Sequence, residues 1–202
     1  MINVVLALMV IISFLFAIPL HECGHALMAS WLGDRTPRSE GRLSLSIPEH
    51  IDPLGTLMCV ILAFQPGFPV GLGWGKPVKA DPWKMRVGAN TGVLLVAIAG
   101  PIFSLLVGLV FALIVRFIPA SLYVEPFLIR IPQFVLVFAV VNICLAIFFL
   151  LPFLAQFAGL ASFPLFQLPF YIWMGGMKIA ELASGLLPTT DILHLYLYNI
   201  PH

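Results

Sequence analysis

Apolar residues occur along this chain in long uninterrupted runs. The first run extends from about Val4 to Leu32, and later runs cover about Gly92 to Phe117 and about Ile131 to Leu151. Each run reaches the roughly 20 mostly apolar residues that a membrane-spanning helix needs. The pattern therefore predicts several helices that cross a lipid bilayer.

Another apolar segment starts near Leu54 but is broken by the sequence QPGFPVGLGWGKP at Gln65–Pro77. Proline and glycine at this density end a helix, and irregular backbone at membrane depth must be buried in protein or line a cavity. Two basic loops, 33–52 and 73–90, flank the segment. A complete span would put these loops on opposite sides of the membrane. The segment is therefore either re-entrant, or the positive-inside signal is weak.

After about Leu151 the chain stays apolar but is interrupted by prolines, and we expect one or two further spans there. The prediction is an all-α multi-pass membrane protein with about 4–6 spanning helices. The sequence LSLSI at Leu43–Ile47 alternates apolar and polar residues, which predicts a short interfacial strand and loop region after the first helix. We expect a single membrane domain, residues 1–202, with a core over 1–152 and a divergent apolar tail over 153–202.

Composition supports a membrane protein and argues against other classes. The chain is 61% hydrophobic and 9% charged, whereas soluble domains are about 45–50% apolar and about 25% charged. The net charge is +1, which gives no electrostatic basis for binding nucleic acid. Three single cysteines lie in apolar segments, so we expect buried small side chains and no disulfide framework.

The first apolar run contains the stretch IPLHECGHALMA, with His21, Glu22 and His25. Residues four apart share one face of a helix. His21 and His25 can therefore bind one Zn²⁺ from the same side, with Glu22 beside them as general base. Polar groups inside a bilayer are costly unless partnered, so their default interpretation is functional. The alternative is that the two histidines only hydrogen-bond neighbouring helices.

Other polar and small residues have alternative interpretations. His50 is either a further ligand or, more simply, a histidine bonded within its loop. Asp52 precedes a proline and is typical of a helix N-cap, and Gly24 allows another backbone to approach closely. The segment GWGKPV at Gly73–Val78 is either an extended edge that pairs with a substrate strand or an interfacial turn anchored by Trp74.

Five pieces of the sequence resemble, in order and spacing, the compact bacterial branch of the site-2 protease family of intramembrane zinc metalloproteases. The pieces are HECGHALMASWLGD, GRLSLS, HIDPLGTL, GWGKPV and AIAGPIFSLLVGLV. The resemblance covers about Val4 to Pro152. It implies a bacterial plasma-membrane protein whose helices enclose a zinc site and which hydrolyses peptide bonds in or near membrane segments of other proteins. His21 and His25 would be metal ligands, and Glu22 the base.

The sequence departs from the family pattern at two positions that bear on the site. The family's third zinc ligand is an aspartate in a later helix, and that position falls on Phe157, which has no ligating atom. Ser104 stands where the family usually has asparagine, and serine can still hydrogen-bond. Three accounts are open. Asp191 or Glu181 supplies the ligand; the protein is a non-catalytic structural or regulatory subunit of a larger membrane complex; or the sequence past about Phe148 has diverged through a frameshift.

Overall fold

The computed structural model describes residues 3–66, 69–119, 121–125, 127–158, 168–185 and 192–197, with the side chains of all but 152–158 and 192. The described residues form helices and no named strand, so the all-α prediction is confirmed. The elements are α1 (Val4–Trp31), α2 (Thr36–Ser39), α3 (Ile47–His50), α4 (Pro53–Ala63), η1 (Pro82–Lys84), α5 (Ala89–Phe117), α6 (Ser121–Val124), α7 (Arg130–Ala158), α8 (Leu168–Ser184) and α9 (Ile192–Leu197).

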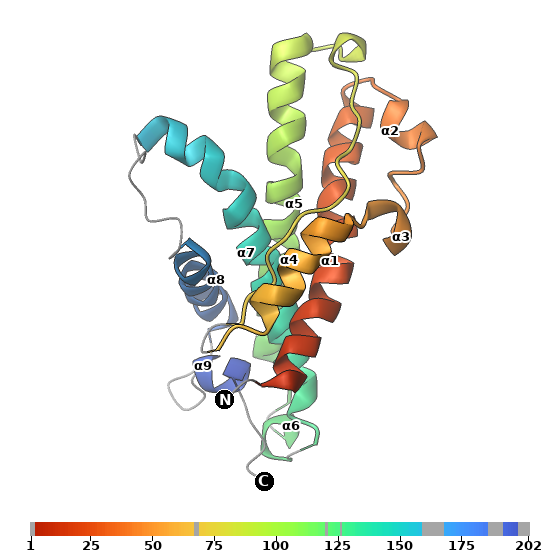
Figure 1. The fold of residues 1–202 in the computed structure, drawn as a ribbon. Coiled ribbons are helices and arrows are strands. Elements are labelled where there is room, and N and C mark those ends of the chain that lie inside the picture. Colours follow the sequence, from red (N-terminus) through yellow and green to blue (C-terminus); the bar gives the residue numbers. More distant parts are fainter. Residues whose placement is uncertain are drawn as a thin grey trace.

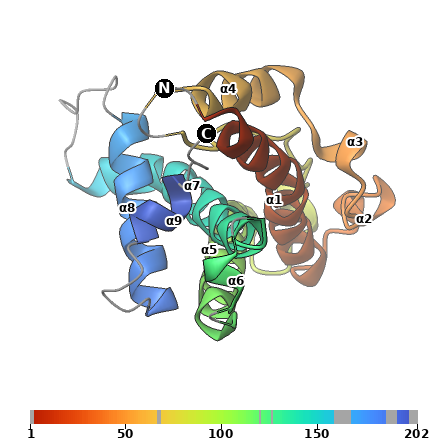
Figure 2. The ribbon, with the colours of Figure 1, turned by 90° about the horizontal axis from the view of Figure 1, so that it is seen from below.

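Three helices in the described part of the chain are long and apolar enough to cross a membrane: α1, α5 and the Arg130–Leu151 part of α7. Each packs against the other two (Figures 1 and 2). Their outer faces carry exposed apolar side chains such as Leu8, Phe16 and Leu106, which suit a lipid environment. With 17 residues, α8 is at the lower limit of the range of about 17–25 for a spanning helix.

The broken apolar segment forms a short helix followed by extended backbone. Asp52 caps α4 by accepting hydrogen bonds from the N–H groups of Leu54 and Gly55, as the sequence predicts. The helix has 11 residues, which corresponds to about 16 Å and is too short to cross a bilayer. Residues 69–81, here called the strap, then run back along α1 in an extended conformation (Figure 1).

Glycine at every second position lets the strap lie against every fourth residue of α1. Two extended residues rise about 6.6 Å and four helical residues about 6 Å, so the two periods nearly match. A Cβ on any of these glycines would press into an α1 side chain. The distances from an ideal Cβ are 3.2 Å for Gly71 to Val10 Cγ1, 2.8 Å for Gly73 to Phe14 Cζ and 2.6 Å for Gly75 to Ile18 Cγ2.

The two basic loops meet at the C-terminal end of α1. The N–H of Arg86 donates to the carbonyl of Leu32 at 2.9 Å, and the N–H of Asp81 donates to Asp34 Oδ2 at 2.6 Å. Both loops therefore lie at the same end of the helix bundle. This arrangement favours the first of the two alternatives from the sequence, in which α4 and the strap form a re-entrant segment.

The predicted strand at Leu43–Ile47 is wrong. The segment forms a turn and then enters α3, which has Pro48 in its first turn. Its polar groups bond locally: Ser44 Oγ donates to Glu49 Oε2 at 2.7 Å, and the Ser44 carbonyl pairs with His50 Nε2 at 2.8 Å. Serine side chains often support such turns in place of a strand ladder. The alternation of residue types therefore reflects local hydrogen bonds.

Cysteine labelling should place the two basic loops on one side of the membrane. The design uses single cysteines at Arg38, Lys79 or Glu125, in a chain whose native cysteines are replaced by alanine. A membrane-impermeant maleimide should reach positions 38 and 79 from one side and position 125 from the other. The positive-inside rule predicts that the shared side is cytoplasmic. Labelling of positions 38 and 79 from opposite sides would show that α4 and the strap cross the membrane.

The Asp34 carboxylate is a buried tether between α1 and the strap, and its loss should destabilise the fold. Burial alone would raise the pKa of Asp34, but hydrogen bonds from Thr36 and from the Asp81 N–H, with the charge of Lys84, hold the pKa below its usual value. Asn in its place offers one acceptor oxygen instead of two. We expect Asp34→Asn to lower the free energy of unfolding by about 1–2 kcal/mol at pH 7.

The pH dependence of this effect follows from the depressed pKa. The carboxylate stabilises the folded state above its unfolded pKa of about 3.9. This contribution is lost as the pH falls through the lower folded pKa. The difference in stability between wild type and Asp34→Asn should therefore be smaller at pH 3 than at pH 7. Thermal unfolding in detergent measures this difference. An equal gap at both pH values would mean that the charge does not contribute.

Candidate functional site

The candidate site lies where α1 crosses α5 at close range. An ideal Cβ on Gly24 would lie 3.1 Å from Gly100 Cα and 2.7 Å from Phe103 Cβ, and a Cβ on Gly100 would collide with the ring of His25. The close approach expected at Gly24 is confirmed. Because neither glycine has a side chain, the polar residues of α1 reach the backbone and side chains of α5 directly.

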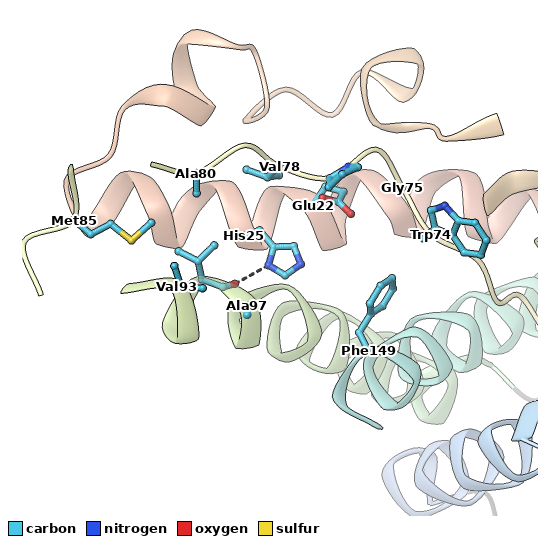
Figure 3. Close-up of a pocket in the computed structure, with 12 residues that line it drawn as sticks. Glu22, His25, Trp74, Gly75, Val78, Ala80, Met85, Val93, Ala97 and Phe149 are labelled. Carbon is cyan, nitrogen blue, oxygen red and sulfur yellow. Dashed lines mark hydrogen bonds between the residues drawn. The ribbon is translucent and has the colours of Figure 1, made fainter. Parts of the chain in front are cut away.

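The two histidines of α1 converge on one point. His25 Nδ1 donates to the carbonyl of Val96 at 2.6 Å (Figure 3), and His21 Nδ1 lies 2.9 Å from Ser104 Oγ. The two Nε2 atoms are 3.2 Å apart. The spacing of four residues thus places both rings on one face, and α5 orients each ring through its Nδ1.

These hydrogen bonds decide which nitrogen atoms can hold a metal. A carbonyl has no proton to donate, so His25 Nδ1 carries the hydrogen and Nε2 of the neutral ring has a free lone pair. The Ser104 hydroxyl can donate or accept. When it accepts from His21 Nδ1–H, the Nε2 lone pair of His21 faces that of His25. When it donates, His21 Nε2–H can donate to His25 instead.

The separation of the Nε2 atoms fits a zinc ion. Two nitrogen ligands at about 2.0–2.1 Å from a tetrahedral zinc lie about 3.3 Å apart. The observed distance is 3.2 Å. With both Nδ1 atoms protonated, the two lone pairs repel each other unless a cation lies between them. The donor set and its geometry therefore fit the metal that the motif predicts.

Glu22 lies beside the histidines in the wall of a cavity of about 470 Å³. The cavity is lined by Glu22 and His25 of α1, the strap, the first turns of α5, and Phe149 of α7 (Figure 3). Glu22 is buried, and its Oε1 would lie 3.1 Å from a Cβ on Gly75. The carboxylate and the strap therefore border the same cavity.

The strap presents one unused hydrogen-bonding edge at this cavity. An isolated antiparallel bridge joins Gly75 to Ile51, and the N–H of Lys76 donates to the His50 carbonyl at 2.7 Å. Neighbouring residues of an extended chain point their polar groups to opposite edges. The N–H and C=O of Gly75 have no hydrogen-bond partner among the described residues. The backbone here is extended, as the first of the two interpretations of this segment requires, and its pairing with a substrate strand stays a prediction.

No third ligand joins His21 and His25 within the described residues. His50 is bonded within its loop through the Ser44 carbonyl, which is the simpler of its two interpretations. Glu181 instead forms an ion pair with Lys178 on α8, at 2.9 Å. Asp191 lies outside the described residues.

The helix expected to carry the third ligand brings a phenylalanine to the site. The ring of Phe149 lies 4.4 Å from that of His21, centroid to centroid, tilted by 31°. Phe157 is eight residues further along α7, about 12 Å at the rise of a helix, and its side chain is outside the described part. The position that the resemblance gives to aspartate is thus more than two helical turns from the residue that contacts His21.

Two residues at the site could not have been identified from the sequence. Phe149 is one of 17 phenylalanines, and no local pattern distinguishes it from lipid-facing ones. Arg42 is buried and bonds the strap, yet the sequence shows only a third arginine in a polar loop. The signal for Arg42, a buried cation in a loop, exists only in three dimensions.

Comparisons with known proteins relate the chain to a metalloprotease. No family model matches it, and no solved structure does. The chain is 30% identical over 144 residues to a protein of Bacillus subtilis (strain 168) named "Putative zinc metalloprotease YwhC". The alignment covers 70% of this chain and 62% of that protein, so the chain spans less than two thirds of its relative's length. This similarity supports a relationship to a family of metalloproteases, the coarser part of what the motifs imply.

Proposed function

We propose that this protein is a multi-pass zinc endopeptidase of the site-2 type in a bacterial plasma membrane. Its substrates are other membrane proteins, cleaved in or near their membrane segments. The observation that carries the proposal is the pair of Nε2 atoms of His21 and His25, 3.2 Å apart. His25 and Glu22 line one cavity, which lies among helices long enough to span a bilayer. The similarity to a protein named as a zinc metalloprotease supports the metal and the reaction class.

His21 and His25 would hold the metal through Nε2, with Ser104 and the Val96 carbonyl fixing the two rings from behind. Such outer partners orient metal ligands and raise their basicity. When bound, zinc supplies Lewis acidity, which polarises a scissile carbonyl and makes a water molecule more acidic. Catalytic zinc usually has three protein ligands. By residue type, Asp191 and His202 are the candidates in the part of the chain that is not described.

Glu22 would move the proton in this reaction. Its carboxylate borders the same cavity as His25, so it is placed to take a proton from the attacking water. The oxygen of that water bonds to the scissile carbonyl carbon, and the C–N bond then breaks. Glu22 returns the proton to the leaving nitrogen, which completes hydrolysis without a net change in the protein.

The free edge at Gly75 suits a substrate whose helix has locally unwound. Unwinding exposes peptide N–H and C=O groups that cannot remain unpaired away from water. The N–H and C=O of Gly75 can pair with them, as an edge strand pairs with an added strand. Such pairing would hold the scissile peptide beside Glu22. The alternative function, a non-catalytic subunit of a membrane complex, rests only on Phe157 at the expected ligand position.

The purified protein should bind about one zinc per chain, and His21→Ala should lose it because one Nε2 ligand is removed. Ser104→Ala should retain zinc with an affinity reduced about 10- to 100-fold, because the ring loses its outer partner. His194→Ala, at an exposed histidine of α9, is the matched control and should bind like wild type. Elemental analysis and chelator competition measure both effects. A zinc-free wild type with intact helices would refute the proposed centre.

Glu22→Gln should abolish hydrolysis while retaining zinc, because the amide keeps the shape of the side chain but cannot accept the proton. The expected fall in rate is at least about 100-fold. The assay reconstitutes the protein with a panel of single-span apolar peptides and identifies products by mass spectrometry. Glu125→Gln, at an exposed carboxyl, should cleave normally. Unchanged cleavage by Glu22→Gln would remove the base role, whereas no cleavage by wild type together with a co-purifying complex would favour the subunit.

A further inference from the structure

Arg42 is a buried cation that bonds two separate segments of backbone. Its side chain is almost fully buried. Nη1 donates to the carbonyls of Glu49 at 2.8 Å and Lys76 at 3.2 Å, and Nη2 reaches the carbonyl of Pro77 at 3.5 Å. Arg42 forms no ion pair with a carboxylate among the described residues. The hydrogen bonds of the guanidinium therefore join the loop before α4 to the strap.

This arrangement is specific to the planar fork of arginine. A buried charge is costly unless its donors are satisfied, and here carbonyl groups of two segments satisfy them. Arginine presents several donors in one rigid plane, whereas lysine is a single flexible point charge. The three donors of lysine sit on a single nitrogen, so lysine could not reach in the same geometry the carbonyls that Nη1 and Nη2 of Arg42 bond. The geometry thus depends on the guanidinium group as well as on its charge.

The bonded part of the strap is the part that borders the candidate site. The N–H of Lys76 donates to the His50 carbonyl, and the carbonyl of the same residue accepts from Arg42. The peptide groups of Lys76 are thus held from the loop side. Gly75, directly before it, contacts Ile18 and Glu22 of α1. Arg42 therefore sets the position of the strap edge relative to Glu22.

We propose that Arg42 is a positioning residue that holds the strap in register over the cavity, so that its free edge at Gly75 can bind an extended substrate backbone. This inference rests on the proposed function for the identity of the substrate. Arg42 bonds neither candidate metal ligand. It reaches the cavity only through the carbonyl of Pro77, a lining residue of the strap, and so acts through the strap. The positive charge of Arg42 also attracts the Glu22 carboxylate. The test must therefore distinguish the effect of the planar hydrogen-bonding group from the effect of the charge.

The test compares Arg42→Lys, which keeps the charge, with Arg42→Met, which does not. Arg38→Met, at an exposed arginine of the same loop, is the matched control. The probe is a fluorescent apolar peptide kept extended by β-branched residues, and its affinity is measured in the Glu22→Gln background, so that binding does not depend on cleavage. KM and kcat for a cleaved panel peptide are measured with Glu22 present. Zinc content and tryptic cleavage after Lys79, an exposed strap residue, are measured in parallel.

Both Arg42 variants should bind the probe about tenfold more weakly, the ratio expected from one lost charge-assisted hydrogen bond. KM should rise by a similar factor with little change in kcat, zinc content should stay at the wild-type level, and trypsin should cleave the strap faster. Recovery of affinity by Arg42→Lys would overturn the proposal in favour of the charge. A fall in kcat or zinc with unchanged affinity would overturn it in favour of a general structural role.

These readouts remain informative if the enzyme proposal itself fails. A wild type that cleaves no peptide but binds the probe in an Arg42-dependent manner would support the positioning role and refute only the hydrolytic function. A wild type that cleaves the panel, with probe affinity and KM indifferent to Arg42, would refute the positioning role alone. If Arg42→Met fails to fold, Arg42→Lys alone decides, because it preserves a buried donor while removing the fork.

Discussion

The close crossing of α1 and α5 is the constraint on which the candidate site depends. Gly24 and Gly100 remove the side chains that would separate the helices. The resulting contact brings the Val96 carbonyl and the Ser104 hydroxyl to the Nδ1 atoms of the two histidines. Since each ring is fixed from behind, both Nε2 atoms point to one place. The two helices therefore hold both Nε2 atoms at the distance that a zinc ion would need, inside an apolar bundle.

The strap forms part of the cavity wall, where its polar backbone groups need partners because the setting is apolar. Its glycines allow it to lie against α1, and the Ile51–Gly75 bridge and Arg42 hold its backbone on the loop side. The N–H and C=O of Gly75 have no hydrogen-bond partner in the described part of the chain. An edge left unpaired in an apolar setting is costly, and the substrate binding proposed above would offset that cost.

The sequence suffices for the local features of the fold and site. Continuous apolar runs predict both ends of α1 and α5 to within three residues, and the start of α7, because spanning helices need such length and composition. Helix α7 continues to Ala158, seven residues past the predicted end at Leu151. The spacing of His21 and His25 places them on one face, and Asp52 caps α4 as its position before a proline suggests. The strand at Leu43–Ile47 failed because residue alternation cannot tell a strand ladder from local side-chain hydrogen bonds.

Relations between distant segments were decided only by the tertiary structure. The sequence left open whether the two basic loops lie at one end of the bundle, and hydrogen bonds between them show that they do. It gave no sign that Arg42 is buried or that Phe149 lies against His21. It marked Ser104 as a position that bears on the site, but not that its partner is His21. Helical periodicity, helix caps and the length of apolar runs depend on residues that are close in sequence, so the sequence alone predicts them. Burial and convergence arise when helices pack, and no local pattern encodes them.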